Sequence, residues 1–289
     1  MTTSANLAYD PSGSALLTPA LHAPLFRADR AYDSVQLGAE CARLAYLKAE
    51  SDPAAHGQLA EALARVGFGA PRLFRDVATG TEGYGALRAS DGLALLAFRG
   101  TEATTLADLA TDIAFVPEPW TEAGGLVHGG FARALRSVLA DVRNWRDVDC
   151  AQRQRLLLCG HSLGAALATL AASAFQDAAS ELVTIGSPRV GDEAFAASVR
   201  AQRITRLVDC CDLVTHLPLQ SPWHVHVGAM HYIDRLGALH APAPADADVD
   251  HDQMRARIEF TLQHALQPGS AGARDLADHA PINYLRALF

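Results

Sequence analysis

Residues 156–164 read LLLCGHSLG, and this stretch decides the fold. Its apolar run, 156–159, is typical of a strand that is buried on both faces of a parallel sheet. The G-x-S-x-G pattern that follows is typical of a tight turn between a strand and a helix, which holds a serine hydroxyl above the sheet edge. The stretch therefore predicts that Ser162 is a nucleophile. It also predicts that the N–H of Leu163, at the start of the helix, stabilises an oxyanion.

The segments around this turn alternate between helices and apolar strands. After the turn, strands are predicted at 182–185 and 204–208, with a helix at 193–201 between them. Before it, the pattern predicts a helix at 31–49, strands at 73–77, 84–88 and 93–98, and a helix at 131–145. This order predicts an α/β fold with a mostly parallel central sheet and helices on both faces.

The chain length suits one large domain, since 289 residues are too few for two α/β domains of ordinary size. Residues 1–25 are rich in Ala, Ser, Thr and Pro without periodicity, which predicts a flexible arm. Residues 26–289 are expected to form a single α/β-hydrolase domain. Within it, 241–250 has the composition of a linker-like insertion, and helices are expected at 253–266 and from Pro281.

The composition excludes several classes of partner. Hydrophobic residues make up 49% of the chain and charged residues 19%, which fits a globular protein with a large core. The 24 basic and 32 acidic side chains give a net charge of −8 and form no basic stripe, so nucleic acid is not expected as a partner. The negative balance also weakens attraction to anionic membranes.

The cysteines and the N-terminus bear on the cellular location. There are five cysteines, an odd number without metal-ligand spacing, which indicates reduced thiols and a reducing compartment. The sequence contains neither a recognisable secretory signal nor an apolar run of the length that a membrane span requires. We therefore expect a cytoplasmic location, although non-standard export is left open.

A serine nucleophile of this fold needs an acid and then a histidine later in the chain. Asp209 and Asp212 both follow a predicted strand, where that acid is expected. His161 is attached next to Ser162 on a sharp turn, so its side chain is expected to point away from the hydroxyl and to be packed as a structural residue.

The base is to be chosen from the later histidines, which are His216, His224, His226, His231, His240, His251, His264 and His279. His216 is too close in sequence to Asp212 to face it across a site. His224 and His226 form an H-x-H pair on a predicted strand, but no third metal ligand is evident, so no metal site is expected.

Several separated motifs together are similar to one family. They are FRGT at 98–101, VHGGF at 127–131, the turn around Ser162, SPRVG at 187–191, DLVTHLP at 212–218 and DHAPINYL at 278–285. From about Ser34 to Leu288 the chain resembles the class 3 lipases, the fungal-type triacylglycerol lipases with their bacterial and plant relatives.

The resemblance implies roles for residues at the matching positions. It favours Asp212 over Asp209 as the acid, because the DLVTHLP segment matches the acid loop of the family. It favours His279 as the base, on a late loop before the last helix, with His224 and His226 as alternatives. It also implies that Thr101 supplies the second oxyanion donor.

The stretch between Thr101 and His128 has an apolar stripe at Leu106, Leu109, Ala110 and Ile113. The resemblance implies that this segment is a lid, and that residues 105–115 make transient contact with a lipid interface. The alternative is an ordinary helix packed on the core. The family often has Trp where Leu109 stands, which puts strong interfacial activation in doubt.

These observations predict a serine carboxylic ester hydrolase that forms an acyl-enzyme on Ser162 and needs neither a metal nor an organic cofactor. The resemblance implies a lipid-like or hydrophobic acyl ester as substrate. Phospholipase A1 and acyltransferase activity would use the same residues. A non-catalytic binding protein on a hydrolase fold is the alternative from another class.

Overall fold

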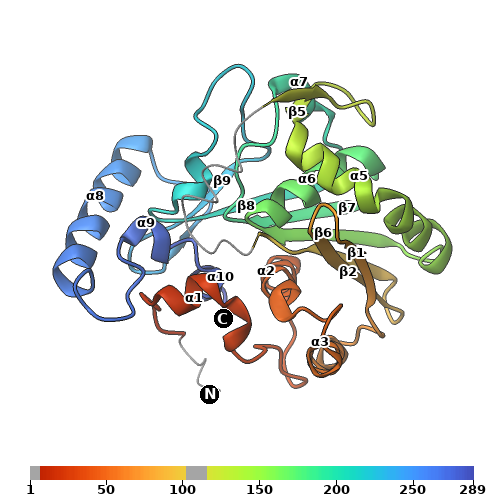
Figure 1. Ribbon diagram of the computed structural model, residues 1–289, viewed down its shortest axis with the longest axis horizontal. Helices are drawn as coiled ribbons and strands as arrows, with labels where there is room; N and C mark the ends of the chain where they lie inside the picture. The colour runs from red at the N-terminus through yellow and green to blue at the C-terminus, as the bar shows by residue number, and fades with distance from the viewer. Residues whose placement is uncertain (1–6, 102–115) are drawn as a thin grey trace.

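The centre of the molecule is an eight-stranded sheet, seen in a computed structural model that describes residues 7–101 and 116–289 (Figure 1). The strands are β1 (Arg72–Asp76), β2 (Thr81–Arg88), β3 (Leu93–Phe98), β6 (Arg155–His161), β7 (Ser180–Ile185), β8 (Arg203–Asp209), β9 (Met230–Ile233) and β10 (Leu239–His240), and their order in the sheet is β1-β2-β3-β6-β7-β8-β9-β10. The run from β3 to β9 is parallel, and antiparallel pairs close both edges. A separate ribbon pairs β4 (Pro117–Pro119) with β5 (Leu126–His128).

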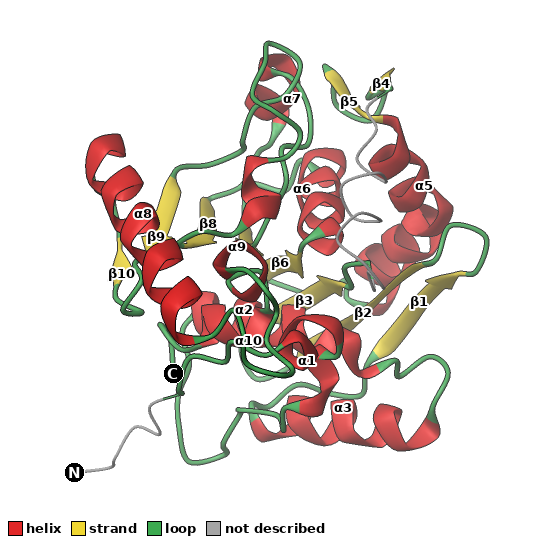
Figure 2. Ribbon diagram, turned by 60° about the vertical axis from the view of Figure 1, so that its left-hand side comes forward, coloured by secondary structure: helices red, strands yellow, loops and turns green. Residues whose placement is uncertain are grey.

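Helices cover both faces of this sheet (Figure 2). The α-helices are α1 (Gly13–Leu17), α2 (Ser34–Leu44), α3 (Pro53–Arg65), α5 (Gly129–Asn144), α6 (Leu163–Phe175), α7 (Glu193–Ser198), α8 (Asp246–Gln263), α9 (Arg274–Ala277) and α10 (Pro281–Leu285). Short 3₁₀ turns are η1 (Pro19–Leu21), η2 (Ala45–Leu47) and η4 (Leu213–His216), and η3 (Trp145–Asp149) is a π turn. Among the described residues, none of the helices combines the length and the apolar character needed to cross a membrane.

Two cores form because successive strand residues point to opposite faces. On β6, Leu157 and Cys159 pack with α2, α3 and α10, whereas Leu156 and Leu158 pack with α5 and α6. All six residues of β3 are buried, which is why this strand and β6 read as continuous apolar runs. The predicted α/β-hydrolase fold, with its mostly parallel sheet, is confirmed.

Two predictions about irregular segments need correction. From Leu7 onward the predicted flexible arm is packed: Ala15 is 1% exposed, Pro19 is also buried, and the N–H of Gly13 donates to the carbonyl of Gly269. The partners of this segment come from the far end of the chain, so its local composition did not reveal them. Residues 246–250 of the predicted linker form the first turns of α8, where aspartates favour the helix N-terminus.

All five cysteines are free thiols and are buried, at 1% exposure or less: Cys41, Cys150, Cys159, Cys210 and Cys211. Burial raises the pKa of the Cys41 and Cys159 thiols well above the usual range. Thiols held in this state are protected from reaction by packing, whatever the redox state of the surroundings.

Candidate active site

Ser162 lies in the turn that joins β6 to α6. Its own backbone angles are φ 57° and ψ −128°. Such a conformation is strained for a residue with a side chain and persists only where the surroundings enforce it. The neighbouring glycines explain how this is possible. A Cβ on Gly160 would overlap the backbone of Gly164, and a Cβ on Gly164 would overlap the carbonyl of Phe98. The close approach of strand and helix therefore requires glycine at both positions.

Three side chains from distant parts of the sequence meet at this turn. The hydroxyl oxygen of Ser162 lies 3.0 Å from Nε2 of His279. The other ring nitrogen of His279, Nδ1, lies 3.0 and 2.9 Å from the two carboxylate oxygens of Asp212. All three side chains are buried, with His279 the most exposed at 3%. The structure thus brings together the serine, histidine and aspartate predicted from the sequence.

Asp212 lies just beyond β8 and is surrounded by hydrogen-bond donors. Besides His279, the N–H of Val214 donates to it at 2.8 Å and the hydroxyl of Tyr284 at 2.5 Å. Burial raises the pKa of Asp212, but the His279 ring and the hydrogen bonds from His279 and Tyr284 outweigh burial, so that the pKa lies below its usual value. Asp212 is therefore ionised and can stabilise an imidazolium.

Asp209, the other acid considered, occupies a different environment. Its carboxylate pairs with Arg286 at 3.3 Å. Burial and the neighbouring Asp278 raise the pKa of Asp209 well above its usual value. Since the carboxylate of Asp209 is directed at Arg286, the geometry favours Asp212 as the acid that faces His279.

His161 lies beneath the site, as predicted for a packed residue. Its Nδ1 is 2.7 Å from the hydroxyl of Tyr46, and its Nε2 is 2.8 Å from the backbone carbonyl of His279. Burial, together with the nearby His279, lowers the pKa of His161 well below its usual value. The neutral ring therefore links Tyr46 to the loop that carries His279.

The alternative histidines form hydrogen bonds elsewhere. Nε2 of His226 is 2.9 Å from the carbonyl of Thr215, and burial lowers the pKa of His226 to about 3. Nδ1 of His224 is 3.0 Å from the hydroxyl of Ser221. A ring with a pKa near 3 is a poor general base at neutral pH.

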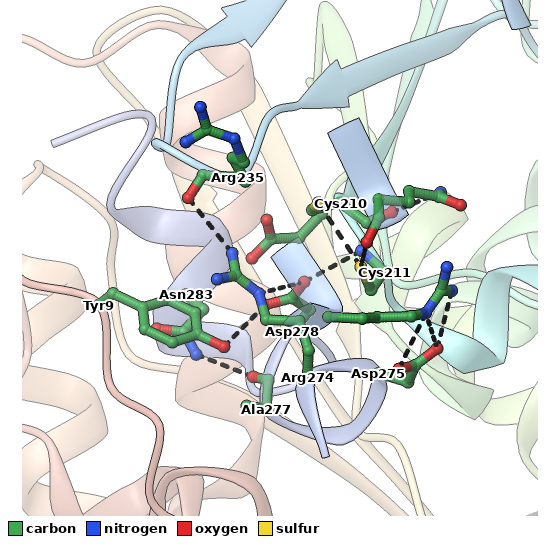
Figure 3. Close-up of polar contacts among 12 residues, drawn as sticks. Tyr9, Cys210, Cys211, Arg235, Arg274, Asp275, Ala277, Asp278 and Asn283 are labelled. Carbon is green, nitrogen blue, oxygen red and sulfur yellow. Dashed lines mark hydrogen bonds and ion pairs between the residues drawn. The ribbon is translucent and has the colours of Figure 1, made fainter. Parts of the chain in front are cut away.

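A network that sequence reasoning missed holds the loop of His279 in place (Figure 3). The carboxylate of Asp278 is fully buried and accepts hydrogen bonds from Nε of Arg274 at 2.7 and 2.8 Å. The N–H of Cys211 and the hydroxyl of Tyr9 also donate to it, each at 2.9 Å. Asp278 thus joins the loop of the base to that of the acid and to the N-terminal segment.

A second link to the N-terminal segment lies on the other side of His279. The side-chain oxygen of Asn283 accepts from the N–H of Asp10, and its side-chain nitrogen donates to the carbonyls of Asp10 and Ala277, all at 2.8 Å. His279 is therefore flanked by two anchors, Asp278 and Asn283. The sequence contains no local signal for either contact, because the partners are about 270 positions apart.

One group in the described part of the chain has the composition of a metal site. The sulfurs of Cys210 and Cys211 and a carboxylate oxygen of Asp278 lie within 4.8 Å of one another. However, Arg274 already supplies a positive charge to Asp278. This donor set therefore fits a structural ion pair better than a metal centre.

A cavity of about 290 Å³ opens beside Ser162. It is lined by Thr79, Thr101, His128, Gly130, Phe131, Ala134, Ser162, Leu163, Pro188 and Val214. The two predicted oxyanion donors, Thr101 and Leu163, thus line the same cavity as the serine hydroxyl. The predicted lid, 105–115 with its apolar stripe at Leu106, Leu109, Ala110 and Ile113, lies outside the described residues.

The loop before Thr101 is anchored against this turn. A Cβ on Gly100 would overlap the hydroxyl of Tyr46. The guanidinium of Arg99 pairs with Glu50 at 3.0 Å and also with Glu82. These contacts fix the loop that brings Thr101 to the cavity.

Comparisons with known proteins agree with this geometry. Residues 95–221 match the family model described as Lipase (class 3). The secreted mono- and diacylglycerol lipase A of Penicillium cyclopium is 35% identical over 162 residues, which are 54% of this chain and 52% of the relative. A lipase of Rhizopus niveus is 30% identical over 172 residues, 55% of this chain and 43% of the relative. The chain spans about half the length of these curated relatives.

A solved structure is similar over a larger part of the chain. A mutant form of MDLA from Penicillium cyclopium has a TM-score of 0.56 and 28% identity, covering 69% of this chain and 77% of that one. The fold and the sequence motifs therefore point to the same group of proteins.

The comparison overturns the predicted cytoplasmic location, since the Penicillium relative is named a secreted lipase. The prediction relied on the unpaired cysteines as well as on the lack of a recognisable secretory signal, and the structure explains why the first argument failed. The five thiols are shielded by packing, so they need no reducing compartment to stay free.

Proposed function

Because this chain belongs to the class 3 lipase family, we propose that it is a carboxylic ester hydrolase that cleaves lipid-like acyl esters through an acyl-enzyme on Ser162. The observation that carries this proposal is the continuous hydrogen-bonded chain from Ser162 through His279 to Asp212, beside an open cavity. We further propose that residues 26–289 act as one catalytic domain, onto which the preceding residues from 7 onward are packed.

In the first half of the reaction, the hydroxyl oxygen of Ser162 attacks the ester carbonyl carbon while Nε2 of His279 accepts its proton. The resulting imidazolium is stabilised by the ionised Asp212, which keeps Nδ1–H directed at its carboxylate. As the tetrahedral intermediate collapses, the bond to the leaving alcohol breaks and His279 donates the proton to that alcohol. The acyl group remains on Ser162.

The second half repeats these steps with water. His279 removes a proton from a water molecule, which attacks the acyl carbon, and then returns the proton to the oxygen of Ser162 as the acid leaves. The negative oxygen of both intermediates would be stabilised by the backbone N–H of Leu163 at the start of α6 and by Thr101. All the groups that this scheme needs are supplied by the chain itself.

The cavity supports a hydrophobic acyl group as the part of the substrate that is bound. Its walls include Phe131, Ala134, Pro188 and Val214, which offer apolar contact near Ser162. The name of the Penicillium relative, a mono- and diacylglycerol lipase, supports an acylglycerol as the substrate. Phospholipase A1 and acyltransferase activity differ only in leaving group or acceptor. Transient contact of residues 105–115 with lipid remains part of the proposal.

The deciding experiment compares wild type, Ser162→Ala, His279→Ala and His226→Ala on p-nitrophenyl esters from short to long acyl chains. We expect kcat/KM to fall by about 10³-fold or more in the first two variants and to stay near wild type in the third. Equal activity of wild type and Ser162→Ala would refute the nucleophile. If His226→Ala abolishes activity while His279→Ala keeps it, the assignment of the base is wrong.

A serine-directed fluorophosphonate probe separates the enzyme from the rival binding protein. We expect the probe to label wild type and to leave Ser162→Ala unlabelled, because labelling needs an activated hydroxyl. Lack of labelling in wild type, together with inactivity on every ester, would favour the non-catalytic interpretation.

A further inference from the structure

We propose that residues 217–229, the loop between η4 and β9 that we term the interface loop, dock on the surface of a neutral lipid phase. The inference rests on the proposed function, because it names the surface from which the substrate is drawn. Two large apolar side chains of this loop face solvent: Leu219 is 77% exposed and Trp223 is 53% exposed. The loop projects beside α7 in both views of the molecule (Figures 1 and 2).

The lack of charged residues in and around the interface loop indicates which kind of lipid surface it can bind. From 213 to 233 the sequence contains neither Asp, Glu, Lys nor Arg, although such residues make up 19% of the chain. Apolar side chains and a tryptophan ring can therefore enter a lipid interface without drawing a charged group out of water. The chain carries a net charge of −8, which disfavours an anionic surface. An uncharged or zwitterionic lipid surface is the one that fits both facts.

The interface loop begins close to the cavity of Ser162. Val214, four positions before Pro218, lines that cavity, and so does Pro188. Arg189, which follows Pro188 in the sequence, holds the start of the interface loop through hydrogen bonds. Its backbone N–H donates to the carbonyl of Leu217 at 2.8 Å, and its side chain donates to the carbonyl of Pro218 at 2.7 Å. The start of the interface loop is thus tied to the wall of the cavity that holds the nucleophile.

The tip of the loop is held in a defined shape. Ser221 and His224 exchange two backbone hydrogen bonds, at 3.3 and 3.0 Å, and their side chains are also 3.0 Å apart. Trp223 lies between these two residues in the sequence, and its side chain is exposed. On the return path, the N–H of Val225 donates to the carbonyl of Gly191 at 2.8 Å. The exposed side chains are thus presented on an ordered turn, and little conformational entropy is lost on docking.

Tryptophan fluorescence provides a direct test. The other two tryptophans, Trp120 and Trp145, are 1% and 4% exposed, so a change of polarity on docking is reported by Trp223. Phosphatidylcholine vesicles are titrated into Ser162→Ala, a background chosen to prevent hydrolysis. We expect a blue shift that saturates with lipid, that disappears in Trp223→Phe, and that is weaker with vesicles rich in phosphatidylglycerol.

Leu219→Ser in the same background is expected to weaken vesicle binding at least tenfold. Leu262→Ser is the matched control, since Leu262 is an equally exposed leucine, at 81%, on α8. Failure of phosphatidylcholine to shift the spectrum, or an equal loss in both leucine variants, would overturn the proposal. A blue shift that follows protein concentration without lipid would indicate a second copy as the occupant and would also overturn it.

Activity measurements keep this proposal distinct from the proposed function. With Ser162 present, Leu219→Ser should hydrolyse a soluble p-nitrophenyl butyrate at the wild-type rate and an emulsified acylglycerol at least tenfold more slowly. An equal loss on both substrates would refute docking while leaving hydrolysis established. If wild type cleaves neither ester, the proposed function fails, and vesicle binding by Trp223 fluorescence still decides docking.

Discussion

Three buried aspartates near the base differ in pKa because their partners differ. Asp212, with several hydrogen-bond donors, has a lowered pKa, whereas burial raises the pKa of Asp209 and of Asp278. For Asp278 the positive charge of Arg274 opposes this effect of burial. All three side chains are fully buried, and Asp212 differs from the other two in that its carboxylate contacts the ring of His279, whose charge is the largest effect that lowers its pKa.

Removing one of those donors should change both stability and its pH dependence. Tyr284→Phe deletes the hydroxyl that donates to Asp212, which should lower the free energy of unfolding at pH 7 by about 1.5–3 kcal/mol, as for other hydrogen bonds to charged groups. Because the folded-state pKa of Asp212 is lowered, its stabilising contribution exists above the unfolded pKa of about 3.9 and is lost as pH falls through the folded pKa. The difference in the free energy of unfolding between wild type and Tyr284→Phe, measured by urea denaturation, should therefore become smaller at low pH.

Tyr232→Phe is the matched control, since this buried hydroxyl donates to Asp252 at 2.9 Å. It should cost stability while leaving kcat near wild type, whereas Tyr284→Phe should lower kcat as well. A deficit of Tyr284→Phe that does not shrink at any pH between neutrality and the onset of acid unfolding would contradict the role assigned to Asp212.

At the scale of single elements, the turn between β6 and α6 depends on contacts that leave no space for a methyl group. Gly164→Ala should lower the free energy of unfolding by more than about 3 kcal/mol, because the added Cβ would overlap the carbonyl of Phe98 and the helix would have to move. Chemical denaturation at neutral pH measures this. Gly57→Ala in α3 is the control, with nothing within 4 Å of its Cβ, and should be neutral or stabilising by about 0.5–1 kcal/mol. Equal effects at both sites would contradict the packing argument.

The loop of the base depends on α9 in a similar way. Asp278→Asn keeps the shape of the side chain but leaves Arg274 buried without its counter-charge, which should cost about 3–5 kcal/mol. We expect kcat to fall with it, because the anchor next to His279 is weakened. The same measurements on Asp275→Asn supply the comparison: this aspartate of α9 pairs with Arg257 near solvent, and its loss should cost at most about 1 kcal/mol. A stable, fully active Asp278→Asn would refute the anchoring role.

Elements with a strong local signal could be predicted from the sequence. The apolar run 156–159 and the glycines beside Ser162 fixed the strand and the turn, and 93–98 matches β3 in full. No local signal predicted α3, and the predicted start of α8 was too late because its acidic first turn resembled a linker. Ser162 was found by its motif, Asp212 and His279 were chosen through the family resemblance, and their chemical roles stay predictions. Tyr9 and Asn283 could not be found, since their contacts join opposite ends of the chain.

At the scale of the whole molecule, the two cores enclose Cys41, Cys159 and Cys150, and a third, smaller hydrophobic cluster encloses Cys210 and Cys211. We expect a thiol reagent such as DTNB to react with none of the five in the native protein within minutes and with all five after denaturation. Over a denaturant series, the rate of labelling should follow the population of unfolded protein. Rapid labelling of even one thiol under native conditions would show that one core opens independently of global unfolding.

The contacts between the N-terminal segment and the loop of the base also have a consequence for synthesis. Tyr9 leaves the ribosome well before its partner Asp278, which is added 269 residues later, next to His279. A growing chain therefore contains Ser162 long before it has the base that would activate that serine. The proposed reactive centre is therefore completed only after the segment that carries His279 has been made.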